Sequence, residues 1–310
     1  MYSKQIIFVT LAVALLLFGC AAPAEGTGKM KVVVTLLPQA EFAEEMVGDK
    51  ADVIVMVPPG ASPHSYEPAP SQLEEVAGAS LYFKVGSGVE FERAWMEDIQ
   101  GVNPNLKIID TSHGIALIEM EEHEHHEHEE HEGEEEHEHE EEHVHTGLDP
   151  HIWNSPKNAK VMVENMYEAL AGEDPDNAEY YRANADAYIS RLDQLDSSIS
   201  NTLEGSEDRE FIVFHPAWGY FARDYGLEQV AIEEAGKEPT AQSLQHVVDT
   251  AKEHRIKVVF ASPQFSTSSA ETVASEIGGQ VVLIDPLGKN YLENMQNVSD
   301  AFAAARDAAN

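Results

Sequence analysis

Three histidines of the chain lie beside prolines, in a setting that holds a side chain in place for binding. His64, His151 and His215 each have a proline as a sequence neighbour and stand at the end of an expected structural element. Because proline restricts the backbone, such turns pre-place the imidazole rings and do not leave them mobile. Asp285 has the same setting, after an expected strand and before a proline. Imidazole nitrogen and carboxylate oxygen are ligands that zinc favours, so these four residues are candidates for a divalent cation site.

A low-complexity tract precedes the second of these histidines. Residues 121–145 comprise 14 Glu, nine His, one Gly and one Val, none of which forms a core. We expect this tract to be disordered and to collect cations at many weak sites, because each site must order flexible chain. Its deletion should then remove weak sites and leave one tight site. The alternative is a solvated acidic loop without a metal role, whose deletion changes nothing. The weak ligands expected in the tract are His123, His125, His126, His128, His131, His137, His139, His143 and His145.

The remaining polar candidates are less specific. Glu67 follows His64 closely and is a possible auxiliary metal ligand. His113 lies in an expected loop, where it could cap the loop or belong to a site at the end of the tract. His246 and His254 fall on an expected polar helix and are predicted to be solvated.

Charge and cysteine content exclude several classes of protein. The formal net charge is −37, and the chain stays strongly acidic when the tract is left out. This argues against nucleic-acid binding, which requires a basic face, and favours a cationic ligand or simple solubility. The single cysteine excludes an intrachain disulfide, and the chain is long enough to build a core without one.

The amino-terminal segment has the character of an export signal. Residues 6–18 are apolar apart from Thr10, too short for a bilayer-spanning helix of about 20 residues but suited to a signal peptide. The sequence Leu17-Phe18-Gly19-Cys20 resembles a bacterial lipobox, with Cys20 as the lipidated residue. The alternative is a chance cysteine in the signal peptide, since Phe18 departs from the usual lipobox pattern. We expect a signal peptide over residues 1–20 and a tether over 21–29.

Short β-branched runs alternate with helical patterns from residue 30 onward. This alternation predicts α/β architecture with parallel sheets and helices on both faces. One helical pattern of almost 30 residues, over 175–204, is long enough to bridge two lobes. The expected units are an amino-terminal lobe over 30–174, the linking helix, and a carboxy-terminal lobe over 205–310. Ligands in such folds bind where strands end, so we expect the cation in the cleft between the lobes. The predicted strands are 31–36, 51–57, 81–85, 106–110, 211–214, 229–232, 258–260 and 281–284.

Four segments together resemble the solute-binding lipoproteins of zinc and manganese ABC importers. They are residues 58–70 with His64, 149–153 with His151, 214–221 with His215 and 264–288 with Asp285. The resemblance extends over the whole chain and includes a histidine-rich insertion before the second segment. It implies that each segment donates one metal ligand between two α/β lobes. It also implies capture of Zn(II) outside the cytoplasm, delivery to a permease with its ATPase, a lipid anchor on the outer face of the cytoplasmic membrane, and a monomer.

The ligand types favour zinc over the other functions. Manganese prefers more oxygen, so a manganese carrier of this family would be expected to have Glu where His215 stands. A zinc hydrolase needs an open coordination position and a general base, and the only His-Glu-x-x-His matches are low-complexity ones in the tract. We therefore expect no enzymatic activity. A manganese carrier and a metal-storage or adhesin lipoprotein remain alternatives, and binding stoichiometry separates storage from carriage.

Overall fold

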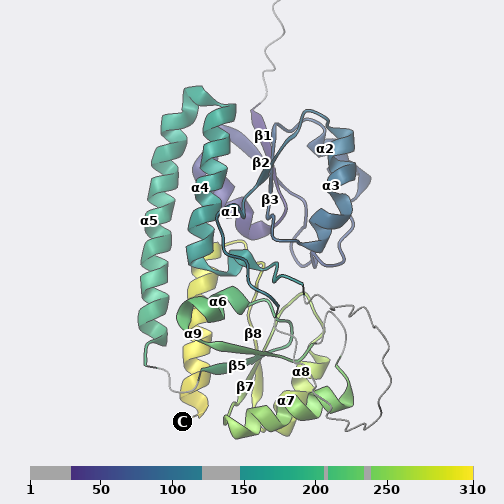
Figure 1. Ribbon diagram of the computed structural model, residues 1–310, viewed down its shortest axis with the longest axis vertical. Coiled ribbons are helices and arrows are strands. Elements are labelled where there is room, and N and C mark those ends of the chain that lie inside the picture. Colours follow the sequence, from purple (N-terminus) through teal and green to yellow (C-terminus); the bar gives the residue numbers. More distant parts are fainter. Residues whose placement is uncertain (1–28, 121–146, 206–208, 234–238, 310) are drawn as a thin grey trace, which may run out of the picture.

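Two parallel four-stranded sheets, each flanked by helices, make up the protein (Figure 1). The computed structural model describes residues 29–120, 147–205, 209–233 and 239–309. The first sheet is built from β1 (Met30–Val34), β2 (Ala51–Val55), β3 (Leu81–Lys84) and β4 (Lys107–Asp110), with α1 (Leu37–Val47), α2 (Pro70–Val76) and α3 (Glu90–Val102) between them. The second contains β5 (Glu210–Val213), β6 (Glu228–Ala231), β7 (Val258–Ala261) and β8 (Gln280–Leu283), with α6 (Gly219–Tyr225), α7 (Ala241–Glu253), α8 (Ser268–Glu276) and α9 (Tyr291–Ala309). No helix in these ranges is long and apolar enough to cross a membrane.

Both sheets have the same strand order, and this order locates the expected binding edge. The orders are β2-β1-β3-β4 and β6-β5-β7-β8, with every neighbouring pair parallel. In the first sheet β2 is added on one side of β1 and β3 on the other, so the strand order switches between β1 and β3. In the second sheet the same switch lies between β5 and β7. Loops at the carboxyl ends of the strands near such a switch form a natural crevice. The fold class predicted from the sequence is confirmed, because each predicted strand is present within a few residues of its expected bounds.

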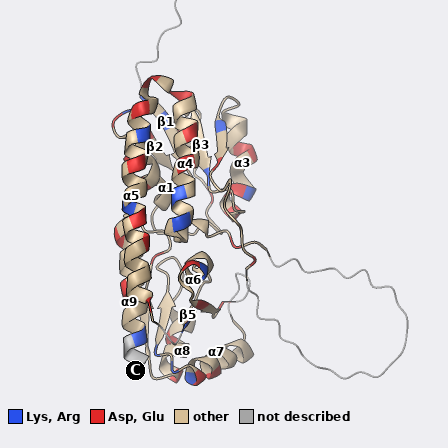
Figure 2. Ribbon diagram, turned by 60° about the vertical axis from the view of Figure 1, so that its left-hand side comes forward, with Lys and Arg blue, Asp and Glu red and all other residues tan. Residues whose placement is uncertain are grey.

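A long helical hairpin spans both halves of the molecule. It consists of α4 (Pro156–Glu173) and α5 (Ala178–Leu203), joined by a 3₁₀ turn at Pro175–Asn177. The α5 helix contacts α1 and α4 beside the first sheet and α9 beside the second (Figure 1). Ion pairs between the two helices join Lys160 to Asp193 and Arg182 to Glu164, and Figure 2 shows acidic and basic positions interspersed along them. The exact division into lobes at residues 174 and 205 stays a prediction.

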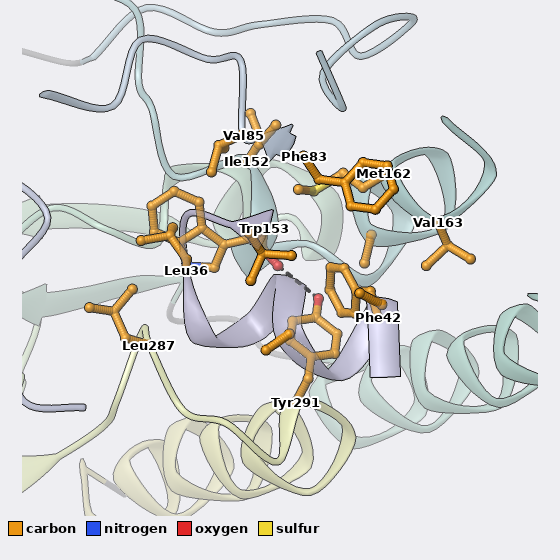
Figure 3. Packing of buried hydrophobic residues seen from close by; sticks show 14 of the residues in the cluster. Leu36, Phe42, Phe83, Val85, Ile152, Trp153, Met162, Val163, Leu287 and Tyr291 are labelled. Atoms are coloured by element: carbon orange, nitrogen blue, oxygen red, sulfur yellow. Dashed lines mark hydrogen bonds between the residues drawn. The ribbon is translucent and has the colours of Figure 1, made fainter. Parts of the chain in front are cut away.

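A continuous apolar core joins the two sheets on the α9 side. Tyr291, the first residue of α9, is buried with its ring edge-on to Phe42 of α1 at 4.9 Å between centroids (Figure 3). Its hydroxyl donates to the backbone oxygen of Trp153 at 2.8 Å, and the Trp153 indole nitrogen donates to the oxygen of Pro286 at 2.7 Å. The segment around Trp153 is therefore anchored to the second half of the molecule by two hydrogen bonds.

Candidate metal centre

Three imidazole rings converge between the two sheets. Nε2 of His215 lies 3.1 Å from Nε2 of His64 and 3.2 Å from Nε2 of His151. Candidate ligand atoms of the three residues all lie within 4.8 Å of one another. In a regular tetrahedral site with zinc–nitrogen bonds of 2.0–2.1 Å, two ligand nitrogens are about 3.3 Å apart. The spacing of these nitrogens therefore fits a shared zinc ion.

A carboxylate holds the other nitrogen of each ring. Nδ1 lies 2.8 Å from an oxygen of Glu90 in His64, 2.8 Å from Asp149 in His151 and 3.1 Å from Glu233 in His215. An ionised carboxylate can only accept a hydrogen bond, so each Nδ1 carries the proton. A neutral ring then has its lone pair on Nε2. Three lone pairs thus point into one small volume, which is favourable when a cation lies among them.

Burial favours the neutral form of the His215 ring. His151 and His215 are buried, whereas His64 is partly exposed. Burial lowers the pKa of His215 to about 4, although its hydrogen bond to Glu233 acts in the opposite direction. For Glu90, burial acts to raise the carboxyl pKa, but the hydrogen bond to His64 and further electrostatic interactions outweigh burial, and the pKa is lowered. At neutral pH His215 is therefore ready to bind a metal without first losing a proton.

Strand register brings His215 and its carboxylate together. His215 follows β5 by two residues, and Glu233 follows the neighbouring parallel strand β6 by two residues. The Phe214 N–H donates to the backbone oxygen of Phe260, and the Glu233 N–H donates to that of Phe214, so the ladder continues past the strand ends. The pair therefore arises from two equivalent positions on adjacent strands.

His151 lies on a segment that both halves of the molecule hold. One oxygen of Asp149 accepts from the His151 backbone N–H and from its ring at 2.8 Å each. The hydroxyl of Ser87, after β3, donates to the Pro150 oxygen, and the hydroxyl of Tyr220, on α6, donates to the Asp149 oxygen. His64, by contrast, follows β2 in a turn in which its N–H meets the Ser62 hydroxyl at 3.3 Å.

Two other expected ligands lie outside the cluster of three. Asp285 follows β8, and its Oδ1 accepts from the side-chain nitrogen of Gln264 and from the Leu287 N–H, both at 2.8 Å. Glu67 has an exposed side chain. A small pocket beside the histidines is lined by other residues, and neither Asp285 nor Glu67 is among them. Metal binding by Asp285 and Glu67 stays a prediction.

The sequence was less informative about the remaining histidines. His254 was predicted to be solvated, and its side chain is partly exposed. It directly follows α7 and pairs with Glu210 at the start of β5, at 3.2 Å. His246 and His113 are exposed, and the His113 backbone oxygen accepts from Asn165. Cys20, the signal peptide and the tract with its nine histidines lie outside the described residues.

The three carboxylate partners were not identified from the sequence. Asp149 could have been found, because an Asp two residues before a fixed His can accept its backbone N–H. Glu233 had a weaker signal, its place after β6 matching that of His215 after β5. Glu90 opens α3 and had no signal that separates it from an ordinary acidic first turn.

Comparison with known proteins identifies a large group of relatives. A family model described as ZnuA, zinc-uptake complex component A, periplasmic, matches residues 32–305. The high-affinity zinc uptake system protein ZnuA of Bacillus subtilis is 35% identical over 318 residues, covering 96% of this chain and 95% of the relative. The zinc-binding lipoprotein AdcA of Streptococcus pneumoniae is 29% identical over 95% of this chain, which spans 59% of the length of AdcA.

Solved structures show the same fold. A crystal structure of ZnuA is 39% identical with a TM-score of 0.80, covering 90% of this chain and all of that one. A ZnuA deletion mutant with zinc bound is 39% identical with a TM-score of 0.79, covering 90% of this chain and 98% of that one. The Zn(II)-bound ZnuA-like domain of Streptococcus pneumoniae AdcA is 26% identical with a TM-score of 0.72, covering 90% and 100%.

Proposed function

The chain belongs to the family of ZnuA-type zinc-uptake components, and on this premise we propose that it captures Zn(II) outside the cytoplasm for an ABC importer. The observation that carries the proposal is the convergence of three Nε2 atoms, each made an acceptor by a carboxylate on the opposite nitrogen. Zn(II) is the cargo of this site, which accepts the ion from solution and releases it to the importer.

His64, His151 and His215 are the proposed nitrogen ligands, and Asp285 is the expected fourth ligand. Three imidazoles favour zinc, since manganese prefers a shell richer in oxygen. A shell completed by protein groups suits carriage, because a catalytic zinc keeps a position open for water or substrate. The family consists of transport components, which supports the expectation that this chain is not an enzyme.

The importer itself supplies the remaining parts of the system. We expect a membrane permease and an ATPase as partners, with the binding protein acting as a monomer. Cys20 is the proposed lipid anchor on the outer face of the cytoplasmic membrane. The description of the family as periplasmic and of a pneumococcal relative as a lipoprotein supports this location.

A competition titration tests the proposal. Purified protein and a chelator of known affinity compete for zinc, with manganese in a parallel series. We expect one tight zinc ion per chain, weaker manganese binding, and a loss of the tight site in His151→Ala. His246→Ala, on the exposed side of α7, is the matched control and should bind as the wild type does. Many equivalent weak ions, or tight zinc binding by His151→Ala, would overturn the proposal.

A further inference from the structure

Gln264 carries a buried polar atom that the site described so far does not use. It lies in the loop between β7 and α8 and lines the pocket of the three histidines. Its side-chain oxygen Oε1 is buried and has no hydrogen-bond partner among the described residues. Buried acceptors are almost always satisfied in native proteins. An unpaired acceptor on a residue that lines this pocket therefore points to a donor or cation that the described residues do not supply.

The orientation of the Gln264 amide follows from its neighbour. The loops after β7 and β8 are adjacent, because Ala261 pairs with Leu283 at the strand ends. Nε2 of Gln264 lies 2.8 Å from Oδ1 of Asp285. A carboxylate oxygen can only accept, so the amide must turn its NH₂ group toward Asp285. The unpaired atom of the amide is therefore its oxygen, Oε1. This assignment follows from the hydrogen bond to Asp285 and would hold even if the nitrogen and oxygen of the amide could not be told apart.

We propose that the Gln264 oxygen completes the cation site, either as a direct ligand or through one metal-bound water. The inference rests on the proposed function and refines the site of that function. In this arrangement Gln264 takes the fourth position that the proposed function assigned to Asp285. Asp285, whose Oδ1 is shared by Gln264 and the Leu287 N–H, then acts as a positioning residue. The three imidazoles and the Gln264 oxygen are all neutral, so only the carboxylates behind the rings compensate the charge of the cation. Because no charged group then binds the ion directly, the site favours a cargo that can be exchanged over a permanently held ion.

Two variants separate Gln264 from Asp285 as the source of oxygen. Gln264→Leu removes the oxygen at similar size. The double variant Gln264→Glu with Asp285→Asn keeps the hydrogen bond between the two positions with donor and acceptor exchanged. Position 264 therefore keeps a second oxygen that is not bonded to position 285. Zinc affinity is measured against a chelator. The visible absorption spectrum of the Co²⁺-loaded protein reports the ligand shell directly.

We expect Gln264→Leu to bind zinc at least about tenfold more weakly, the usual range for groups that orient or complete a metal site, with a changed Co²⁺ spectrum. The double variant should recover most of the affinity. Gln245→Leu is the matched control, because Gln245 also donates to an aspartate, Asp249 at 2.8 Å, but on the exposed side of α7. It should leave affinity and spectrum unchanged.

Three outcomes would overturn the inference. They are wild-type affinity and spectrum in Gln264→Leu, a double variant as weak as Asp285→Asn alone, and a zinc-loaded structure in which an Asp285 oxygen occupies the fourth position. In such a structure, a Gln264 oxygen at about 2.0–2.2 Å from zinc marks a direct ligand, and an intervening water marks the bridged form. If the wild-type protein itself binds zinc weakly, the proposed function fails, whereas tight wild-type binding with an unaffected Gln264→Leu removes only this inference.

Discussion

The carboxylates behind the three imidazoles differ in their exposure to solvent. Side-chain exposure is 4% for Asp149 and 5% for Glu233, but 47% for Glu90. A hydrogen bond to a charged group is stronger where water is excluded, and its loss leaves a buried donor unpaired. The two buried carboxylates should therefore contribute more to orienting their rings than Glu90 does.

This difference predicts a graded effect on zinc affinity. Glu233→Ala should weaken zinc binding about tenfold or more, since it frees the His215 ring and lowers its basicity. Glu233→Gln, which keeps an acceptor for Nδ1, should lose less, and Glu90→Ala should also lose less than Glu233→Ala. Chelator competition measures all three. Glu228→Ala, at an exposed position on β6, the strand that Glu233 follows, is the control. Equal losses at Glu90 and Glu233 would contradict the role assigned to burial.

At this scale the sequence predicted the histidines better than their partners. His64, His151 and His215 could be selected because neighbouring prolines mark fixed turns at element ends. Glu90 and Glu233 are two among 56 acidic residues, and only the strand order places Glu233 next to His215. The role of Gln264 depends on contact between two loops, which local sequence does not specify.

Among the elements, the turn at Ile152–Asn154 leads into α4 and is anchored to the second half of the molecule. Asn154 donates to the Ala217 oxygen beside α6, while the Trp153 oxygen accepts from Tyr291 of α9. Ser155 caps α4 by accepting from the Asn158 N–H at 3.1 Å. His151 directly precedes this turn, so these contacts from the second half of the molecule help to fix its position relative to His215.

Removal of one such contact should cost stability without affecting the metal. Tyr291→Phe keeps the ring against Phe42 but leaves the buried Trp153 oxygen without its donor, which should lower the free energy of unfolding by roughly 1–3 kcal/mol. Zinc affinity should stay within about twofold, because no ligand moves under the small strain expected. Urea unfolding and chelator competition measure the two effects. Tyr180→Phe, at a largely exposed tyrosine on α5, should change neither. A large loss of zinc affinity in Tyr291→Phe would show that the turn is mechanically coupled to the site.

The sequence predicted the regular elements but not this turn. Hydrophobic periodicity identifies strands and helices, and all eight predicted strands are found within the described residues. A three-residue turn held by contacts from α6 and α9 has no periodicity of its own. The same holds for the isolated bridge between Glu119 and Leu148 at the base of the tract, because both depend on residues far away in the sequence.

For the molecule as a whole, acidification should destabilise the metal-free fold through protonation of His215. Its pKa is about 4 in the folded protein and about 6.5 in an unfolded chain. Between these values the unfolded state binds a proton that the folded state does not, so the contribution is present above pH 6.5 and is lost as the pH falls toward 4. A shift of this size amounts to at most roughly 3–4 kcal/mol. Glu90 adds a loss of the same sign at lower pH, because its folded pKa is also lowered.

Other groups change charge over the same range, so the effect of His215 must be measured as a difference. Glu92 is buried and its pKa is raised, chiefly by burial, so its contribution runs the opposite way and favours the folded state at low pH. The net charge of −37 also diminishes on acidification, which relieves repulsion in the folded state. Neither effect depends on the side chain at position 215.

The contribution of His215 to the free energy of unfolding is measured by comparing the wild type with His215→Gln. Both metal-free proteins are unfolded in urea from pH 7.5 to pH 4 with a chelator present. The stability of the wild type relative to the variant should decline by about 1.4 kcal/mol per pH unit below 6.5 and level off near pH 4. With zinc in excess, the wild type should gain stability by mass action at neutral pH and lose that gain as protons compete for the three rings. A difference in stability between wild type and variant that is constant across this range would contradict this prediction. It would mean that the fold does not keep the His215 ring unprotonated.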